Sequence, residues 1–392
     1  MTRGIIDESR TAQAQLSNEE LIRYSRHLIM PEVTIEGQRR LKAARVLCIG
    51  AGGLGSPATL YLAAAGVGTL GLIDSDEVDP TNLQRQILHG TKDVGRRKLD
   101  SGRDRLLDIN PNINIESHDA RFMSANATEL VSPYDVVVDG SDNFPTRYLS
   151  SDVCFWERKP NIYGSVFRFE GQSTVFAPHL GGPCYRCLFP DPPAAGTVPN
   201  CAEAGVLGVL PGIIGLIQAT ETIKLILGQG ESLVGRLLHF DALKMRFREF
   251  NLRRDPQCPV CGQFPTITQP VDYEAFCGTA AQGGTLSVPT ISVHDLKKKM
   301  EDNQPVTIVD VREPFEYEIA RIEGAKLIPL SELPDRLGEL RQNGEIVLMC
   351  KSGTRSAHAV EFLAKAGFAQ PLNLEGGIDA WATEIDQTMP KY

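Results

Sequence analysis

Four cysteines in two C-x-x-C pairs form the clearest chemical pattern in the sequence. Cys184 and Cys187 make the first pair, and Cys258 and Cys261 make the second. Four thiolates on two tight turns match a tetrahedral structural zinc site, which has no open position for a substrate. The long interval between the pairs predicts that Zn²⁺ would clip distant segments of the chain together. A redox dithiol or four unrelated cysteines are the alternatives.

A further cysteine lies in a short loop that suits sulfur chemistry. Cys350 follows the apolar run 346–349, which we predict to be a buried strand, and precedes a predicted helix over 356–366. The loop from Cys350 to Arg355 would direct backbone N–H groups, a helix N-terminus and a guanidinium at the sulfur. Such groups stabilise a sulfur anion, for example a persulfide. An inert buried cysteine is the alternative interpretation.

A glycine-rich turn predicts a phosphate-binding site. Gly50-x-Gly52-x-x-Gly55 follows the apolar run 46–49 and precedes a predicted helix over 57–65. The glycines let the backbone approach a phosphate, and the helix N-terminus directs N–H groups toward it. Asp74 lies about twenty residues further on, where a carboxylate usually binds a ribose hydroxyl. NAD is the first ligand that this pattern suggests, and packing of a helix on a strand is the alternative without a ligand.

Cations near the same strand ends favour ATP over NAD. Asn82-Leu-Gln-Arg85-Gln86 and Lys98 follow the second predicted strand, and Arg26 lies in a polar predicted helix over 19–28. A pyrophosphate leaving group needs several cations directed at its developing charge. Asp142-Asn143 follows another strand and suits Mg²⁺, which takes few carboxylates and keeps several waters. For each cation taken alone, a solvated surface charge is the alternative.

Strands and helices alternate along the chain, which predicts an α/β fold with its ligand chemistry at the carboxyl ends of parallel strands. The first domain would be a Rossmann-like nucleotide-binding fold, with strands predicted over 46–49, 69–73 and 135–138 and a more β-rich region over 161–178 and 237–250. A smaller α/β domain would follow, with helices over 293–300 and 356–366 and strands over 306–311 and 346–349. We therefore predict a disordered tail, a first domain, a linker and a second domain over 1–15, 16–264, 265–287 and 288–392.

Composition and charge narrow the classes of function. The 392 residues are 42% hydrophobic and 23% charged, as is ordinary for a soluble globular protein. A net charge of −9 argues against direct nucleic-acid binding, which needs clustered Lys and Arg. Nine cysteines without a recognisable signal peptide favour the cytoplasm, where thiols serve metals and chemistry. The uncharged run 204–220 is short for a membrane span and contains Pro211, so we predict a buried helix and no membrane association.

The first domain resembles the ubiquitin-activating-like superfamily, in particular the ThiF-type molybdopterin-synthase adenylyltransferases. Besides the motifs above, Asp74-Ser-Asp76 and Arg147-Tyr148 carry this resemblance, which spans about residues 16–264. It implies a homodimer that binds ATP and Mg²⁺ and adenylates a carboxylate with release of pyrophosphate. Arg26 would reach the phosphates from the neighbouring subunit. The implied nucleotide ligands are Gly53, Asp74, Asn82, Arg85, Gln86, Lys98, Asp142 and Asn143.

The second domain resembles a rhodanese domain. The segments Asp310-Val-Arg-Glu-Pro-Phe-Glu316 and Ile322-Glu-Gly-Ala325 carry the resemblance, together with the six-residue loop that begins at Cys350. It implies that Cys350 bears a persulfide whose sulfur comes from thiosulfate or a cysteine desulfurase. Arg321 stands where such domains frequently carry His. This difference bears on the preferred sulfur donor but not on the assignment to the rhodanese class.

The two domains together resemble the two-domain adenylyltransferase/sulfurtransferases. Adenylation makes a carboxylate electrophilic and a persulfide is a sulfur nucleophile, so together they would give a thiocarboxylate. The expected substrate is a small ubiquitin-like sulfur-carrier protein with a C-terminal Gly-Gly. The product would serve molybdenum-cofactor synthesis and, in some lineages, cysteine synthesis or tRNA thiolation. One alternative is a non-catalytic scaffold that recruits carriers. The other is an NAD-dependent oxidoreductase with an appended rhodanese module, but this interpretation leaves Arg85, Lys98 and the two C-x-x-C pairs, which we call the zinc clamp, unexplained.

One more cysteine stands just before the apolar run. Cys201 lies in Pro199-Asn200-Cys201-Ala-Glu-Ala-Gly205, where a loop rich in Pro and Ala meets a predicted helix. A thiol on such a loop would be able to swing over an acyl adenylate, and a helix N-terminus favours its thiolate. We expect Cys201 to resolve an acyl disulfide between the carrier and Cys350. Simple packing at the helix start is the alternative.

Overall fold

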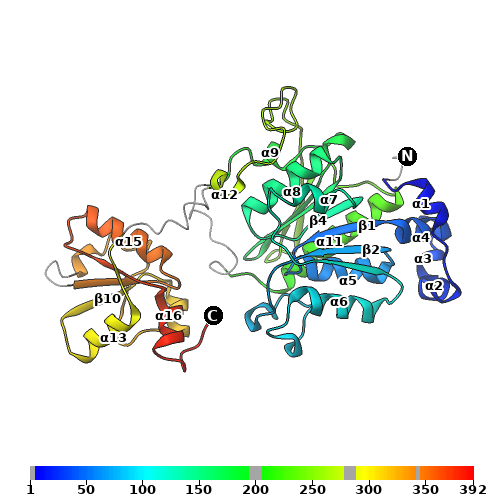
Figure 1. Ribbon diagram of the computed structural model, residues 1–392. Coiled ribbons are helices and arrows are strands. Elements are labelled where there is room, and N and C mark those ends of the chain that lie inside the picture. The colour runs from blue at the N-terminus through cyan, green and yellow to red at the C-terminus, as the bar shows by residue number, and fades with distance from the viewer. Residues whose placement is uncertain (1–4, 194–204, 278–287, 341–344) are drawn as a thin grey trace. The chain divides into compact units, whose positions relative to one another are not determined.

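Two compact units make up the chain, residues 1–279 and 280–392. The computed structural model describes residues 5–193, 205–277, 288–340 and 345–392, and each unit is described by itself (Figure 1). Both units have a central sheet that is covered by helices. The predicted α/β fold class is therefore confirmed for both.

The sheet of the first unit has the strand order β3-β2-β1-β4-β5-β6-β7-β8. The first five strands in this order, β3, β2, β1, β4 and β5, pair in parallel with their neighbours. Strands β6, β7 and β8 continue the sheet with antiparallel pairing. The chain winds away from β1 in both directions, so β1 and β4 flank a switch point where ligands bind in open α/β sheets. The strands are β1 Arg45–Ile49, β2 Thr69–Ile73, β3 Asn114–His118, β4 Val136–Asp139, β5 Asn161–Phe167, β6 Glu170–Phe176, β7 Arg236–Asp241 and β8 Arg246–Asn251.

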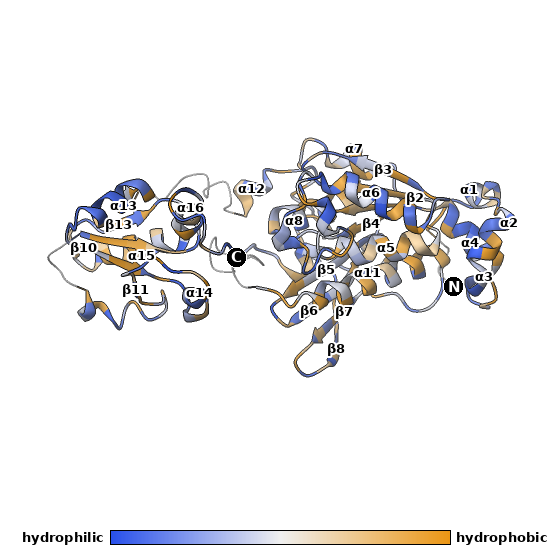
Figure 2. Ribbon diagram, turned by 90° about the horizontal axis from the view of Figure 1, so that it is seen from below, coloured by the Kyte–Doolittle hydropathy of each residue, from blue (hydrophilic) through white to orange (hydrophobic). Residues whose placement is uncertain are grey.

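Helices cover both faces of this sheet because its central strands are apolar on both sides. Val46 and Cys48 pack into one hydrophobic cluster, while Leu47 and Ile49 pack into the other. Figure 2 shows the hydrophobic residues concentrated on the central strands. The first cluster is completed mainly by α4 Thr34–Ala43, α5 Gly55–Ala65, α6 Lys98–Ile109 and α11 Val209–Leu227. The second is completed mainly by α7 Ala127–Val131, α8 Phe144–Trp156 and α12 Tyr273–Phe276, with the short α9 Tyr185–Leu188 beside them.

Helix α11 is the apolar helix predicted over 204–220, but its bounds differ from that prediction. It continues to Leu227 because the charged residues near its end are satisfied locally: Glu221 pairs with Lys224 at 2.6 Å and accepts the N–H of Leu233 at 2.7 Å. Gly228, with φ of +67°, ends it. Among the described residues it is the one helix long and apolar enough to cross a membrane, yet it packs against α5, β5 and β6 inside the first unit.

The second unit has a parallel sheet in the order β11-β10-β12-β13-β9. Strand β12 lies in the middle of this sheet and ends directly before Cys350. The strands are β9 Thr290–Ile291, β10 Val306–Asp310, β11 Lys326–Leu327, β12 Glu345–Met349 and β13 Leu372–Leu374. The helices are α13 Val293–Glu301, α14 Pro314–Ile319, α15 Thr354–Lys365 and α16 Gly377–Glu384.

The predicted disordered tail over 1–15 is wrong for its second half. Residues Glu8–Gln13 form helix α1, which begins at Asp7, whose carboxylate accepts the backbone N–H of Ser9 at 2.7 Å. Arg10 in this helix pairs with Asp135, and Ile6 is buried against the first unit. Burial of apolar surface and an ion pair to a distant residue therefore order a segment whose composition alone suggested disorder. The polar helix predicted over 19–28 is divided at Tyr24 into α2 Asn18–Arg23 and α3 Ser25–Leu28.

The predicted linker over 265–287 also needs correction. Its residues up to 277 belong to the first unit, where α12 packs beside α8 (Figure 1). Tyr273 and Cys277 are buried in the second hydrophobic cluster. The sequence does not predict the burial of these two residues, because the stretch is rich in Gly, Thr, Gln and Pro. A single turn of helix is too short to produce a recognisable periodicity.

Candidate functional site

A cavity of about 780 Å³ lies at the carboxyl ends of the central strands of the first unit. A volume of this size is ordinary for a small-molecule site. The structure brings most of the predicted nucleotide ligands to its wall, namely Gly53, Asp74, Arg85, Gln86, Lys98, Asp142 and Asn143. Asn82 is not on the wall: its carbonyl oxygen accepts the N–H groups of Arg85 and Gln86 and so shapes the turn that presents them.

The glycine turn between β1 and α5 is built for close backbone approach. Gly50 has φ of +92°, and a Cβ on Gly55 would lie 2.0 Å from the Gly50 carbonyl oxygen, so side chains are excluded at both positions. The N–H of Ala51 donates to Asp74 at 2.9 Å, which ties the turn to the end of β2. The sequence did not single out His89, whose Nε2 lies 3.1 Å from the Ala51 carbonyl oxygen. Burial lowers the pKa of His89, so the ring supports the turn in its neutral form.

The predicted phosphate-binding cations differ in their placement. Lys98 is buried at the start of α6, with Nζ 2.8 Å from Asp76 and 4.0 Å from Asp74. Arg85 is half-buried on the cavity wall and donates to the Thr81 carbonyl oxygen at 3.0 Å. Arg26, in contrast, is exposed on α3 and does not line the cavity of its own chain. The structure therefore places two of the three predicted cations, Arg85 and Lys98, on the cavity wall.

The loop after β4 supplies polar groups to the opposite wall. Asp142 is exposed there, and the Asn143 side chain caps α8 by accepting the Thr146 N–H at 3.0 Å. Arg147, one turn into α8, is buried, lines the cavity and donates to the Ser141 carbonyl oxygen at 3.3 Å. Arg147 appeared in the sequence only as part of a family motif. Its burial beside the cavity, which only the fold reveals, adds a cation that the predicted set of Arg26, Arg85 and Lys98 does not contain.

The four cysteines of the two C-x-x-C pairs converge in space. Their Sγ atoms lie within 4.8 Å of one another, with neighbouring sulfurs 3.4, 3.5 and 3.8 Å apart. A tetrahedron of thiolates around zinc, with Zn–S of about 2.3 Å, has edges of about 3.8 Å. Three of the four sulfurs belong to buried residues, and the N–H of Asp255 donates to the Cys187 sulfur at 3.4 Å. The cluster fits a closed zinc site.

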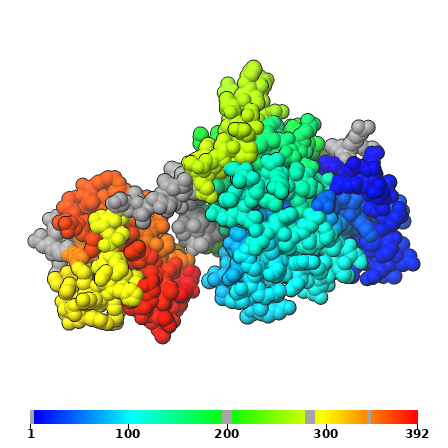
Figure 3. Space-filling model, viewed as in Figure 1, coloured from blue at the N-terminus to red at the C-terminus, as the bar shows by residue number. Residues whose placement is uncertain are grey.

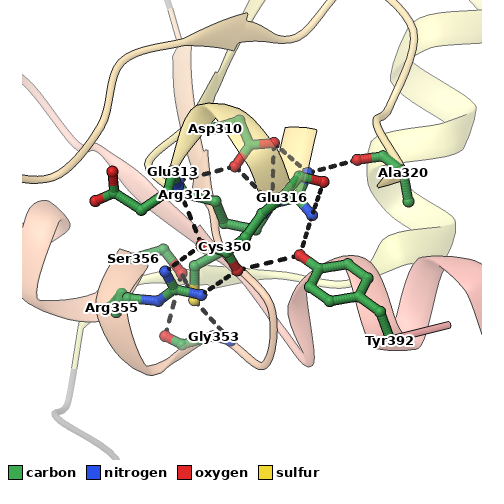
Figure 4. Close-up of polar contacts among 10 residues, drawn as sticks. All are labelled: Asp310, Arg312, Glu313, Glu316, Ala320, Cys350, Gly353, Arg355, Ser356 and Tyr392. Atoms are coloured by element: carbon green, nitrogen blue, oxygen red, sulfur yellow. Dashed lines mark hydrogen bonds and ion pairs between the residues drawn. The ribbon is translucent and has the colours of Figure 1, made fainter. Parts of the chain in front are cut away.

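In the second unit, Cys350 is the first residue of the turn between β12 and α15 (Figure 4). Its sulfur accepts the N–H of Gly353 at 3.1 Å and the hydroxyl of Ser356 at 3.3 Å. Gly353 has φ of +98°, which lets the loop turn its N–H groups inward. Gly377 packs against the loop from outside, since a Cβ there would lie 2.5 Å from the carbonyl oxygens of Cys350 and Lys351. The turn can therefore stabilise a sulfur anion by hydrogen bonding.

The last residue of the loop, Arg355, is held by residues that the sequence did not single out as site residues. Both of its terminal nitrogens donate to the buried carboxylate of Glu316. The hydroxyl of Tyr392 donates to the same carboxylate at 3.1 Å and accepts from Arg312, as Figure 4 shows. Arg312 in turn binds the buried Asp310, with Nε 2.9 Å from Oδ1. The charge of Arg355 is thus fixed in place beside Cys350 by a network reaching from β10 to Tyr392.

Cys201, the predicted resolving thiol, lies outside the described residues, so the structure does not place it. Among the cysteines that are described, Cys48, Cys154 and Cys277 are buried, apart from both the C-x-x-C cluster and Cys350. Burial, with nearby carboxylates, raises the pKa of Cys48 to about 12, and burial raises the pKa of Cys277 to about 11. A raised pKa favours the protonated thiol at neutral pH.

Comparisons with known proteins match both units. The ThiF family model matches residues 24–260, and the model of the rhodanese-like domain matches residues 292–384. The probable adenylyltransferase/sulfurtransferase MoeZ of Mycobacterium tuberculosis is 48% identical over 384 residues, which cover 96% of each chain. The adenylyltransferase and sulfurtransferase MOCS3 of Sus scrofa is 43% identical over 407 residues, which cover 97% of this chain and 89% of that protein.

Solved structures share the fold of the first unit. E. coli MccB in complex with ATP matches with a TM-score of 0.54 and 23% identity, over 61% of this chain and 74% of that chain. PaaA matches with a TM-score of 0.52 and 26% identity, over 60% of this chain and 75% of that chain. The predicted pairing of a ThiF-type Rossmann-like domain with a rhodanese domain is confirmed.

Proposed function

This chain belongs to the ThiF family and carries a C-terminal rhodanese-like domain, and from that premise we propose that it activates and sulfurates a small sulfur-carrier protein. It is an adenylyltransferase and a sulfurtransferase, which are the two activities in the names of relatives that it matches over nearly their full length. The observation that carries the proposal is that one chain holds both a nucleotide-sized cavity with a glycine turn and a cysteine in an anion-stabilising loop. The thiocarboxylate product serves molybdenum-cofactor synthesis, and use in cysteine synthesis or tRNA thiolation stays a prediction.

The first reaction is adenylation of the carrier's C-terminal glycine. A carboxylate oxygen of the Gly-Gly terminus attacks the α-phosphorus of ATP, and pyrophosphate leaves with the electron pair of the broken P–O bond. Asp74 would bind the ribose, while the glycine turn with Arg85 and Lys98 would bind the phosphates and stabilise the developing charge. Asp142, exposed in the cavity beside Asn143, suits Mg²⁺, which offsets phosphate charge when bound.

The second reaction delivers sulfur from Cys350. Its thiolate takes the sulfane sulfur of thiosulfate, releasing sulfite, or that of a desulfurase persulfide, releasing a thiolate. The resulting persulfide attacks the acyl carbon of the carrier adenylate and AMP leaves, which produces an acyl disulfide. The Cys201 thiolate then attacks the Cys350 sulfur, which frees the carrier thiocarboxylate and forms a Cys201–Cys350 disulfide. A cellular dithiol reductant returns both thiols to the reduced state.

Assembly and metal content complete the proposal. Arg26 is exposed and away from the cavity of its own chain, which is the placement expected of a residue that completes the site of a second subunit in a homodimer. Cys184, Cys187, Cys258 and Cys261 would hold one structural Zn²⁺, whose role is to join α9 to the segment around 258–261. The enzyme would act in the cytoplasm, where thiols stay reduced.

Intact mass spectrometry of candidate carriers tests the whole proposal. The full-length chain is incubated with ATP, Mg²⁺, thiosulfate and a carrier that ends in Gly-Gly. The expected product gains one sulfur and loses one oxygen, and it forms only when ATP is present. A carrier without the Gly-Gly terminus is the control and should keep its mass. An unchanged mass of the carriers that end in Gly-Gly would contradict the proposal.

A further inference from the structure

The segment that leads out of the first unit forms part of the wall of the nucleotide cavity. Pro270, Val271, Asp272, Tyr273 and Glu274 line the same cavity as the glycine turn and Asp74. These five residues lie beyond residue 260, where the match to the ThiF family ends. In the space-filling view the yellow-green part of the chain that contains them lies on the outside of the first unit (Figure 3). They therefore lie outside the part of the chain that the ThiF family model covers.

One anchor of this segment lies on the base side of the predicted nucleotide. The hydroxyl of Ser124 donates to the Val271 carbonyl oxygen at 2.6 Å, and Arg121 pairs with Glu274 at 3.5 Å. Residues 120–125 follow β3 and also line the cavity. In a Rossmann-like site the phosphates lie at the end of β1 and the ribose at the end of β2, which leaves the base toward β3. The segment 270–274 thus meets the loop where the base would lie.

The other anchor is the zinc-binding segment. The hydroxyl of Tyr273 donates to Asp152 at 2.8 Å, and the same carboxylate pairs with Arg186 at 2.9 Å. Arg186 lies in α9 between Cys184 and Cys187, and its side chain and that of Asp152 are 1% and 0% exposed. Such a buried pair cannot separate without leaving an uncompensated charge in the interior. The position of α12 is therefore coupled to the fold of the C-x-x-C turn.

We propose that residues 270–274 bind the adenosine end of ATP and that the zinc clamp acts on adenylation by holding them there. Val271 and, from the loop after β3, Phe122 would provide apolar surface for the purine, a role suited to half-buried side chains on a cavity wall. The segment is a specificity-determining wall for the base, distinct from the cationic end that binds the phosphates. This inference rests on the proposed adenylation of a carrier.

Kinetic separation of the two ends of ATP tests the inference. In carrier-dependent ATP–pyrophosphate exchange, Val271→Gly is expected to raise the KM for ATP several-fold and to weaken discrimination against GTP. The KM for pyrophosphate should stay unchanged, because pyrophosphate binds only at the glycine turn and the cations. Tyr273→Phe should give the same pattern while zinc content stays stoichiometric. The control is Phe264→Ser, because Phe264 is 86% exposed and does not line the cavity.

Hydrogen exchange of the unaltered full-length protein gives an independent readout. Addition of ATP is expected to slow exchange of the amides of residues 271–277 as well as those of the glycine turn, with no change in β8. Protection of the glycine turn without protection of 271–277, or an unchanged KM for ATP in Val271→Gly, would overturn the inference and leave the proposed function standing. Protection of neither segment would contradict ATP binding and so defeat both.

Discussion

Arg355 and Glu316 meet through two parallel hydrogen bonds, Nη1 to Oε2 at 2.7 Å and Nη2 to Oε1 at 2.8 Å, although 39 positions separate them in the chain. A bidentate pair of this kind orients a guanidinium as well as binding it. Glu316 is almost completely buried, whereas about a quarter of the Arg355 side chain stays exposed beside the Cys350 loop. The carboxylate therefore positions the arginine at the end of the Cys350 loop.

This pair should make the second unit sensitive to acid. Burial opposes ionisation of Glu316, but hydrogen bonds from Arg355 and the Glu313 N–H outweigh it and hold the pKa of Glu316 below its ordinary value. A carboxyl with a lowered folded pKa stabilises the fold above its unfolded pKa, and this stability is lost as the pH falls through the folded value. Glu316→Gln should therefore lose less stability than the wild type between neutral pH and acid. Thermal melts across this range check it, with the exposed Glu318→Gln as control. Parallel pH profiles of Glu316→Gln and wild type would contradict the prediction.

Loss of Arg85 should slow adenylation. Arg85→Ala removes a cation from the cavity wall, and removal of one preorganised donor to developing charge typically costs about 10²-fold in rate. The measurement is carrier-dependent ATP–pyrophosphate exchange at saturating ATP. Arg103→Ala, which removes an exposed arginine of α6 that does not line the cavity, serves as the matched control. Full exchange activity in Arg85→Ala with normal nucleotide affinity would defeat this assignment.

Zinc content can be measured directly. Freshly purified, reduced protein should contain one zinc per chain, and Cys258→Ser should lose the metal together with thermal stability, because a closed zinc site contributes folding free energy. Cys154→Ser is the control: Cys154 is also buried but lies in α8, outside the cluster. Both variants are expected to be less stable, and only the first should lose zinc. Absence of zinc from the wild type would count decisively against the site.

Substitution of Cys350 should affect sulfur transfer and leave adenylation unchanged. Cys350→Ala is expected to abolish thiosulfate sulfurtransfer while leaving carrier-dependent pyrophosphate exchange intact, because the described residues that line the nucleotide cavity all belong to the first unit. Each activity is assayed on the same preparation of full-length protein. An equal fall in both activities would show that the proposed division of labour is wrong.

Turnover without a resolving thiol should stop at an adduct. Cys201→Ala is expected to retain pyrophosphate exchange and persulfidation of Cys350, yet to accumulate a carrier–enzyme species that added thiol releases. Non-reducing electrophoresis and intact mass spectrometry detect this species, with Cys350→Ala as the variant that cannot form it. Normal multiple turnover by Cys201→Ala without added thiol would show that Cys201 has no chemical role.

The sequence by itself determined the chemistry that depends on short spacing. A glycine turn between a strand and a helix, and a cysteine loop of six residues, each lie within one local unit of structure, so residue types and order specify their geometry. Strand alternation likewise predicted the parallel sheets, because apolar strands that are buried on both faces have a clear pattern. The convergence of the two cysteine pairs also followed, since four thiolates in two such pairs suit one tetrahedral zinc site.

Only the tertiary structure decided which distant residues support those motifs. Glu316 and Tyr392 hold Arg355, and Tyr273 joins the C-x-x-C segment around Arg186 to the nucleotide cavity, across intervals that no local pattern encodes. Their partners are set by how strands and helices pack, and a single buried carboxylate or hydroxyl leaves no periodic signal. The same reason explains the ordered helix α1 and the anchored half of the predicted linker: a few buried side chains and one ion pair overcame a composition typical of loops.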